Sequence, residues 1–157
     1  MNKIDLQNRS AVITGGAQGI GLAIAERLLM SGASVSLWDR DETLVKKTAN
    51  TLASKGNVEY VVMDVTNLDS VKKATNQTKD SLGSIDLLIC SAGIAGPSGK
   101  IWEYPPEEWE RVISVDLTGV FNCLHAVTPL MIGQNYGRIV NIASVAGKEG
   151  NPNAGPY

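Results

Sequence analysis

The sequence predicts an α/β fold, namely a doubly wound parallel sheet with helices on both of its faces. Short apolar runs such as residues 11–13 have the character of buried parallel strands, and they alternate along the chain with longer segments of helical periodicity. A cluster of glycines joins the first of these runs directly to the first helical pattern. Five strands alternating with four helices then predict parallel pairing with right-handed crossovers.

The composition limits the class of protein before any motif is considered. The chain has 157 residues, of which 43% are hydrophobic and 19% charged, so residues 1–157 are expected to form one globular domain. The net charge is −2 and no basic cluster occurs, which argues against a nucleic-acid partner. Because no apolar signal core or run of membrane-spanning length is found, we expect a soluble cytoplasmic protein without a membrane partner.

The two cysteines, Cys90 and Cys123, lie inside apolar segments and have neither metal-like nor disulfide-like spacing. We therefore expect buried, reduced thiols, as in a cytosolic protein, and no metal site.

The glycine-rich stretch from Ser10 to Gly21 is the strongest local signal. Gly15, Gly19 and Gly21 follow the spacing G-x-x-x-G-x-G, which differs from the common dinucleotide fingerprint G-x-G-x-x-G. Such a turn needs residues that tolerate positive φ and allow the backbone to touch a ligand. The helix that follows offers free N–H groups and a partial positive charge to a pyrophosphate. The alternative is an ordinary tight turn between a strand and a helix, but the flanking elements favour a nucleotide site.

Asp39 follows the second predicted strand, 18 residues after Gly21, close to where dinucleotide folds place an acidic residue on the adenosine ribose. A carboxylate there accepts hydrogen bonds from both ribose hydroxyls and repels a 2′-phosphate, which favours NAD over NADP. The alternative role, the N-terminal cap of the next helix, fits Asp41 better. Arg40 favours NADP instead, since its guanidinium could receive a 2′-phosphate.

The other elements follow from the same periodicities, and two helices are predicted to end at a glycine, which favours helix C-termini. In order, they are a helix over 20–31 ending at Gly32, a strand over 34–38, a helix over 42–55 closing at Gly56, a strand over 58–63, a helix over 67–82, a strand over 86–90, a Gly- and Pro-rich loop over 94–106, a helix over 106–131 and a strand over 137–142. The tail over 147–157 is expected to have no element of its own.

Small or polar residues follow two of these strands, at the sheet edge where open α/β folds bind ligands. Asp64 follows the third strand, although it could equally be only a turn residue. Ser91, Ala92 and Gly93 follow the fourth strand and would let the backbone approach a cofactor closely.

The helix over 106–131 is apolar on more than one face. One side is therefore expected to pack on the sheet and the other on a second subunit, giving a homo-oligomer, either a dimer or a tetramer. His125, the only histidine, falls inside this helix and is expected to be a packing or interface residue.

Together these motifs resemble the short-chain dehydrogenases/reductases, in their single-domain branch, along the whole chain. The stretch from Thr14 to Gly21 resembles the T-G-x-x-x-G-x-G cofactor loop of that family, and Asp39 resembles its NAD-selecting acid. Ser91-Ala92-Gly93 is similar to the N-A-G signature, with Ser91 in place of Asn. Ser144 and Tyr157, with twelve residues between them, match the family's catalytic Ser and Tyr.

The resemblance implies a Rossmann fold, of which this chain contains the first five strands, and a role for each matching residue. Tyr157 would be the general acid/base, and because free tyrosine titrates near 10 it would need a cationic environment. Ser144 would bind the substrate oxygen, and the cofactor would carry the hydride. Asp116 occupies the position where the family has an Asn in its proton relay. The cofactor-binding residues would be Gly15, Ala17, Gln18, Gly19, Ile20, Gly21, Asp39, Arg40, Asp64, Val65, Ser91, Ala92, Gly93 and Val115.

The expected function is that of an NAD-dependent oxidoreductase interconverting a secondary alcohol and a ketone. Asp39 favours NAD, whereas the family's 3-oxoacyl reductases resemble NADP users in most members. A sugar acid or polyol is therefore preferred as substrate over a 3-oxoacyl group. The chain ends at Tyr157, before the family's partner lysine and last two strands, so a longer enzyme is expected and the 157-residue chain alone should be nearly inactive and poorly soluble. The alternative is a catalytically inactive nucleotide-binding or interaction module, which Asp116 and the missing lysine favour.

Overall fold

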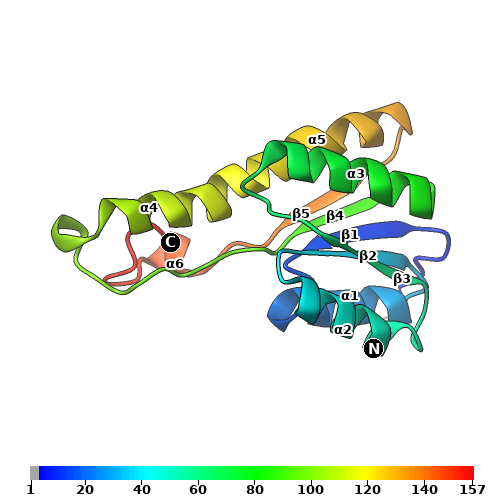
Figure 1. Ribbon diagram of the computed structural model, residues 1–157, viewed down its shortest axis with the longest axis horizontal. Helices are drawn as coiled ribbons and strands as arrows, with labels where there is room; N and C mark the ends of the chain where they lie inside the picture. Colours follow the sequence, from blue (N-terminus) through cyan, green and yellow to red (C-terminus); the bar gives the residue numbers. More distant parts are fainter. Residues whose placement is uncertain (1–3) are drawn as a thin grey trace.

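A computed structural model describes residues 4–157 and contains a five-stranded, fully parallel sheet in the order β3-β2-β1-β4-β5 (Figure 1). The doubly wound α/β fold predicted from the sequence is therefore confirmed. The strands are β1 (Ser10–Thr14), β2 (Ser34–Asp39), β3 (Val58–Val62), β4 (Leu87–Cys90) and β5 (Arg138–Asn141). The helices are α1 (Gly19–Met30), α2 (Glu42–Leu52), α3 (Leu68–Leu82), the 3₁₀ turn η1 (Ile101–Glu103), α4 (Pro106–Ile113), the π-helical turn η2 (Ser114–Thr118), α5 (Gly119–Gly133) and α6 (Ala146–Glu149).

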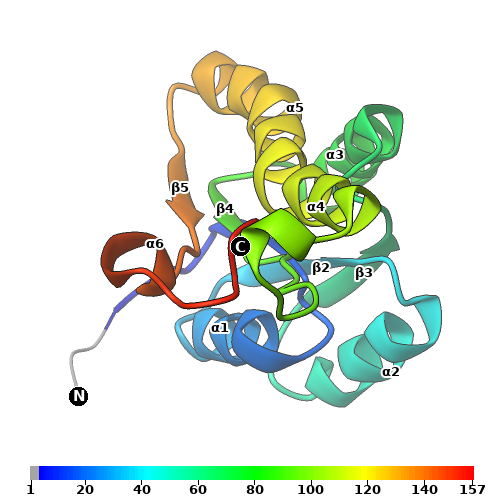
Figure 2. The ribbon, with the colours of Figure 1, turned by 90° about the vertical axis from the view of Figure 1, so that its left-hand side faces the viewer.

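Two helical layers enclose the sheet, with α1 and α2 on one face and α3 and α5 on the other (Figures 1 and 2). Successive strand residues point to opposite faces, so each central strand contributes to two separate cores. In β1, Val12 packs beneath α3 and α5, whereas Ala11 and Ile13 pack against α1 and α2. Burial on both faces explains the continuous apolar runs in β1 and β4.

The central strand β1 marks the point where the chain reverses its direction of winding. From β1 the chain proceeds through α1 to β2, and the later half of the chain adds β4 on the opposite side of β1. In open α/β sheets, ligands bind in the crevice at this switch point, beyond the carboxyl ends of the strands. The segments that follow β4 and β5 extend beyond that end of the sheet, where α4 and α6 lie (Figure 1).

The predicted elements are present, but the structure differs from the sequence-based expectations in four local details. The predicted helix over 106–131 consists of α4, η2 and α5, and it continues to Gly133. The helix predicted over 42–55 ends at Leu52. The loop over 94–106 contains η1, and the tail begins within α6, whose first turn is stabilised by a hydrogen bond from Ala146 N to Ser144 Oγ.

The segment Pro106–Gly133 also corrects the expectation that no apolar run approaches membrane-spanning length. The segment is 28 residues long and contains an 18-residue window with a mean hydropathy of 1.3, so it satisfies that criterion by length and composition. Its buried side chains, including Cys123 and Val127, pack into the core beneath the sheet, and the core helix of a globular domain passes the same test. His125 is exposed and contacts the ring of Phe121, so it does not pack into that core.

Candidate active site

The loop between β1 and α1 is built on glycines whose missing side chains permit close backbone contact. Gly15 has φ +64°, and a Cβ there would lie 2.9 Å from Ala92 Cα. A Cβ at Gly21 would collide with the carbonyl group of Gly15, lying 2.9 Å from its carbon. Gly19 has φ +57° and nothing within 4 Å of its Cβ position, so the loop is tightly packed at its base and open at its tip.

The first turn of α1 is accessible. Gln18, Gly19 and Ile20 are exposed, and Gln18, the N-cap residue, makes no side-chain capping hydrogen bond. The N–H groups of this turn and the positive end of the helix dipole are therefore not neutralised by a side-chain cap. This arrangement suits an anion such as a pyrophosphate.

Two side chains hold the peptide groups of Ala17, in the middle of this loop. Ala17 N donates to Asp39 Oδ2 at 3.1 Å, and Ala17 O accepts from Thr48 Oγ1 at 2.8 Å. Asp39 ends β2 and Thr48 lies in α2. The sequence analysis identified Asp39 but missed Thr48, which no local motif marks.

Asp39 uses both carboxylate oxygens within the protein, because its Oδ1 accepts from Asp41 N at 3.1 Å. Asp41 in turn accepts from Leu44 N at 2.9 Å and caps α2, as expected. A carboxylate has about four lone-pair sites, so Asp39 retains acceptor capacity for ribose hydroxyls. Arg40 is exposed beside it.

The ends of β1 and β4 are joined by one hydroxyl group. Thr14 Oγ1 accepts from Ser91 N at 3.0 Å and from Ala92 N at 3.1 Å. The segment after β4 is thereby held against the base of the glycine loop, where Gly15 and Ala92 are in contact. Thr14 was quoted in the sequence motif but was not assigned this role.

Asp64 and Val65, predicted to contact the cofactor, follow β3. Asp64 Oδ1 accepts from Thr66 N at 2.9 Å and Thr66 Oγ1 at 2.8 Å, so this side chain forms an Asx turn, the alternative role considered from the sequence. Val65 is buried, and its carbonyl accepts from Asn122 Nδ2 at 2.9 Å. Asn122, which the sequence analysis did not identify, thus ties this segment to α5.

Asp116 lies in η2, with Val115 packed beside it against the core. Its Oδ1 accepts from Ile94 N at 2.9 Å, and the Cβ position of Gly93 lies 3.5 Å from the same oxygen. Burial raises the pKa of the Asp116 carboxyl above its ordinary value, and the hydrogen bond from Ile94 opposes this effect in part. The side chain therefore joins the long helical segment to the loop after β4.

Ser144 and Tyr157 both follow β5. Ser144 is partly buried and accepts from Ala146 N at 3.2 Å. Tyr157 is 45% exposed and ends a segment anchored by a hydrogen bond from Gly99 N to Asn153 O at 2.9 Å. The chain end lies near α4 and α6, at the same end of the molecule as the loops after β4 and β5 (Figures 1 and 2). Among the described residues, no hydrogen bond joins Ser144 to Tyr157.

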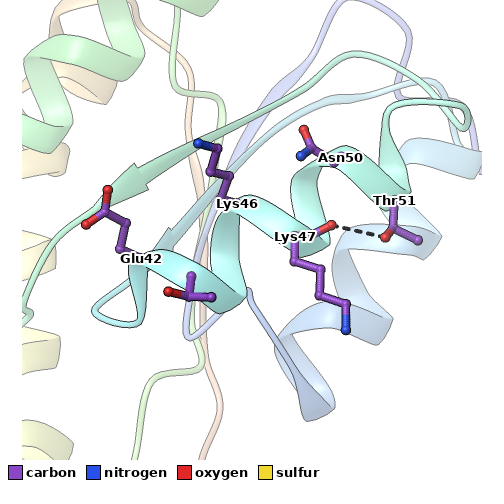
Figure 3. A pocket seen from close by; sticks show the side chains of 6 residues that line it. Glu42, Lys46, Lys47, Asn50 and Thr51 are labelled. Carbon is purple, nitrogen blue, oxygen red and sulfur yellow. Dashed lines mark hydrogen bonds between the residues drawn. The ribbon is translucent and has the colours of Figure 1, made fainter.

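A separate hollow lies on the surface of α2 (Figure 3). Every residue lining it belongs to that helix: Glu42, Thr43, Lys46, Lys47, Asn50 and Thr51. Thr51 Oγ1 bonds the carbonyl of Lys47 within the helix. The hollow includes none of the predicted site residues, so we do not regard it as the functional site.

The fold and this site define a dinucleotide-binding type of α/β protein, and comparison with known proteins identifies the family. The family model described as short chain dehydrogenase matches residues 9–157. The chain therefore belongs to the short chain dehydrogenase family, as the sequence motifs indicated.

Individual relatives cover almost all of this chain. The chain is 44% identical over 149 residues to 2-dehydro-3-deoxy-L-rhamnonate dehydrogenase (NAD(+)) of Sphingomonas sp. (strain SKA58), covering 95% of this chain and 59% of the relative. It is 34% identical over 156 residues to the 3-oxoacyl-acyl-carrier-protein reductase FabG of Staphylococcus epidermidis (strain ATCC 12228 / FDA PCI 1200). That match covers 96% of this chain and 62% of the relative.

Among solved structures, NAD⁺-bound xylitol dehydrogenase superimposes with a TM-score of 0.94 at 36% identity, covering 96% of this chain and 58% of that one. The chain thus spans about three-fifths of the length of the relatives it matches.

Proposed function

We propose that this chain forms the cofactor-binding part of an NAD(H)-dependent oxidoreductase that interconverts a secondary alcohol and a ketone. The observation that carries this proposal is the glycine loop held at Ala17 by Asp39, next to the accessible N-terminus of α1. Membership of the short chain dehydrogenase family supports the reaction class.

The residues present fit a dinucleotide. The backbone contacts at Gly15 and Gly21 leave no space for side chains at the base of the loop, whereas the tip at Gly19 is open. The loop and the first turn of α1 would hold the pyrophosphate, and Asp39 would hold the adenosine ribose. The remaining predicted contacts follow β3 and β4 or lie in η2: Asp64, Val65, Ser91, Ala92, Gly93 and Val115. When bound, nicotinamide supplies the hydride acceptor or donor.

The catalytic roles proposed for this chain's own residues concern the proton and the substrate oxygen. Tyr157 gives a proton to a ketone oxygen, or takes one from an alcohol, at its phenolic oxygen. Ser144 donates a hydrogen bond to the same substrate oxygen and stabilises the negative charge that develops there. Asp116 holds the Ile94 segment beside the site through its hydrogen bond to Ile94 N.

NAD is proposed as the cofactor in preference to NADP because Asp39 places a carboxylate at the ribose position. The names of the relatives that act with NAD(+), or were solved with NAD⁺ bound, support this choice. The substrate proposed is a sugar acid or polyol, in keeping with the same two names, and a 3-oxoacyl compound is the second candidate because of the reductase relative.

The assembly and location proposed are those of a cytoplasmic homo-oligomer. Leu117, Phe121 and Ile132 expose large apolar surfaces along the helical segment 106–133, which supports a subunit contact there. Two free, buried cysteines are in keeping with a reducing compartment.

The direct test is a fluorescence titration of the purified chain with NADH and with NADPH. We expect saturable binding of NADH that is tighter than that of NADPH, whereas tighter NADPH binding would overturn the assignment of Asp39. A steady-state assay of a chain that includes the segments found in the longer relatives, with NAD and a panel of polyols and sugar acids, tests the reaction. Binding of the cofactor without turnover in that assay would favour the alternative function, a catalytically inactive nucleotide-binding module. The specific observation in favour of this alternative is Asp116, which stands where the family has an Asn.

A further inference from the structure

The side chain of Thr48 makes its hydrogen bond outside its own helix. Helical threonines commonly bond the carbonyl four residues earlier in their own helix. Thr51 in α2 does so with Lys47 O at 3.0 Å, and Thr75 in α3 does so with Val71 O at 2.8 Å. Thr48 instead donates to Ala17 O at 2.8 Å, across 31 residues of sequence, and it is only 8% exposed.

This bond determines how one peptide group of the glycine loop is oriented. Ala17 O belongs to the peptide between Ala17 and Gln18, which is planar and trans, so its N–H points in the direction opposite to its C=O. With the oxygen held toward Thr48, the N–H of Gln18 must point away from α2. Gln18 is the N-cap of α1, and its amide therefore belongs to the anion-binding end of that helix.

The preceding peptide is held from the other side, because Ala17 N donates to Asp39 Oδ2 at 3.1 Å. These contacts form a ring that starts and ends at the glycine loop. Asp39 also bonds Asp41 N, Asp41 caps α2, and α2 carries Thr48 back to the loop. The orientation of the loop therefore depends on α2 as well as on β2.

We propose that Thr48 is a positioning residue of the cofactor site, which orients the Ala17–Gln18 peptide so that the loop can bind the pyrophosphate of NAD(H). This inference rests on the proposed function. Thr48 does not contact the cofactor and acts through Ala17.

The test compares NADH dissociation constants, measured by fluorescence titration of the purified chain, for wild type, Thr48→Val and Thr48→Ser. Valine keeps the size of the side chain and removes the hydroxyl donor, whereas serine keeps the donor. We expect Thr48→Val to raise the dissociation constant about three- to tenfold, the equivalent of one net hydrogen bond, and Thr48→Ser to stay within about twofold of wild type.

Thr75→Val is the matched control, because Thr75 is 3% exposed and loses only a bond within its own helix. Urea midpoints are measured for all variants, and Thr75→Val should bind NADH as wild type does even if its midpoint falls. If Thr48→Val does not fold, Thr48→Ala, which also lacks the donor but cannot crowd the site, must show the same rise.

The possible results separate this inference from the proposed function. Wild-type affinity in Thr48→Val or Thr48→Ala overturns the role of Thr48 while leaving NAD binding intact. Equal weakening in Thr48→Ser also overturns it, since the hydroxyl would then not be the group that matters. Absence of NADH binding by wild type overturns the proposed function and this inference together.

Discussion

The carboxylate of Asp39 accepts a hydrogen bond from the backbone N–H of Ala17 at 3.1 Å, joining the end of β2 to the glycine loop. The residue proposed to select NAD over NADP thus also holds the loop proposed to bind the pyrophosphate. Changing the charge at this position should therefore alter both the choice of cofactor and the overall affinity.

Asp39→Asn tests this double role. The neutral amide no longer repels a 2′-phosphate, and its single oxygen cannot serve both Ala17 N and Asp41 N. We expect weaker NADH binding and a shift in the ratio of NADPH to NADH dissociation constants of about tenfold toward NADPH. Fluorescence titrations measure both constants. Asp80→Asn, at an exposed position on α3, is the control and should leave the ratio unchanged.

Gly21→Ala tests whether close packing holds the loop together. The added Cβ would meet the carbonyl group of Gly15, which is backbone and cannot swing aside. We expect the free energy of unfolding to fall by about 1 to 3 kcal/mol, as measured by urea denaturation. Gly133→Ala has nothing within 4 Å of the new Cβ and should be neutral or slightly stabilising. Equal effects at the two positions would contradict this description of the loop.

Asp116→Asn tests the electrostatic consequence of a carboxylate at this position. Burial raises the pKa of Asp116 in the folded chain, so the folded state binds this proton more tightly than the unfolded state does. The contribution of the group to stability is then complete below the ordinary carboxyl pKa, near 4, and is lost as the pH rises through the folded value.

An Asn can still accept from Ile94 N without carrying charge. We expect its urea midpoint to exceed that of wild type at pH 7, with the difference shrinking toward pH 4. A difference that is the same at both pH values would show that the charge of Asp116 does not matter.

The two thiols should be inert in the folded chain. Cys90 and Cys123 are both buried in the core between β4 and α5. The hydrogen bond between the two thiols, together with burial, raises the pKa of Cys123 and keeps it protonated, whereas the same bond lowers the pKa of Cys90, whose protection therefore comes from its burial. We expect negligible reaction with a thiol reagent such as DTNB under native conditions and two equivalents in urea. Rapid native reaction at either cysteine would contradict this burial.

The elements were predictable from the sequence wherever a single local pattern decides them. The central strands β1 and β4 are apolar runs buried on both faces, and Asp41 is a cap with a recognisable position. The interruption at η2 and the short α6 depend on contacts with other segments, such as the hydrogen bond from Ile94 N to Asp116. The local helical periodicity therefore does not predict them.

The motifs of the site could be predicted from the sequence, but the side chains that hold its backbone in place could not. Thr48 bonds Ala17 across 31 residues and Thr14 bonds Ser91 across 77, and threonine in a helix or at a strand end has many ordinary roles. Asp64 had two possible roles, and the structure supports the Asx turn for its side chain. The catalytic roles of Ser144 and Tyr157 remain predictions from family resemblance.

The strand order has a consequence for how the chain folds during its synthesis. β1 is made first but lies in the middle of the sheet, between β2 and β4. Ser91, whose amide N–H donates to Thr14 at the end of β1, lies 77 residues after Thr14 in the chain. A ribosome adds these residues in about 4 to 15 s. Throughout that interval one edge of β1, a strand that is buried along its whole length in the folded chain, has no partner, so protection of the nascent chain by a chaperone would matter most before β4 emerges.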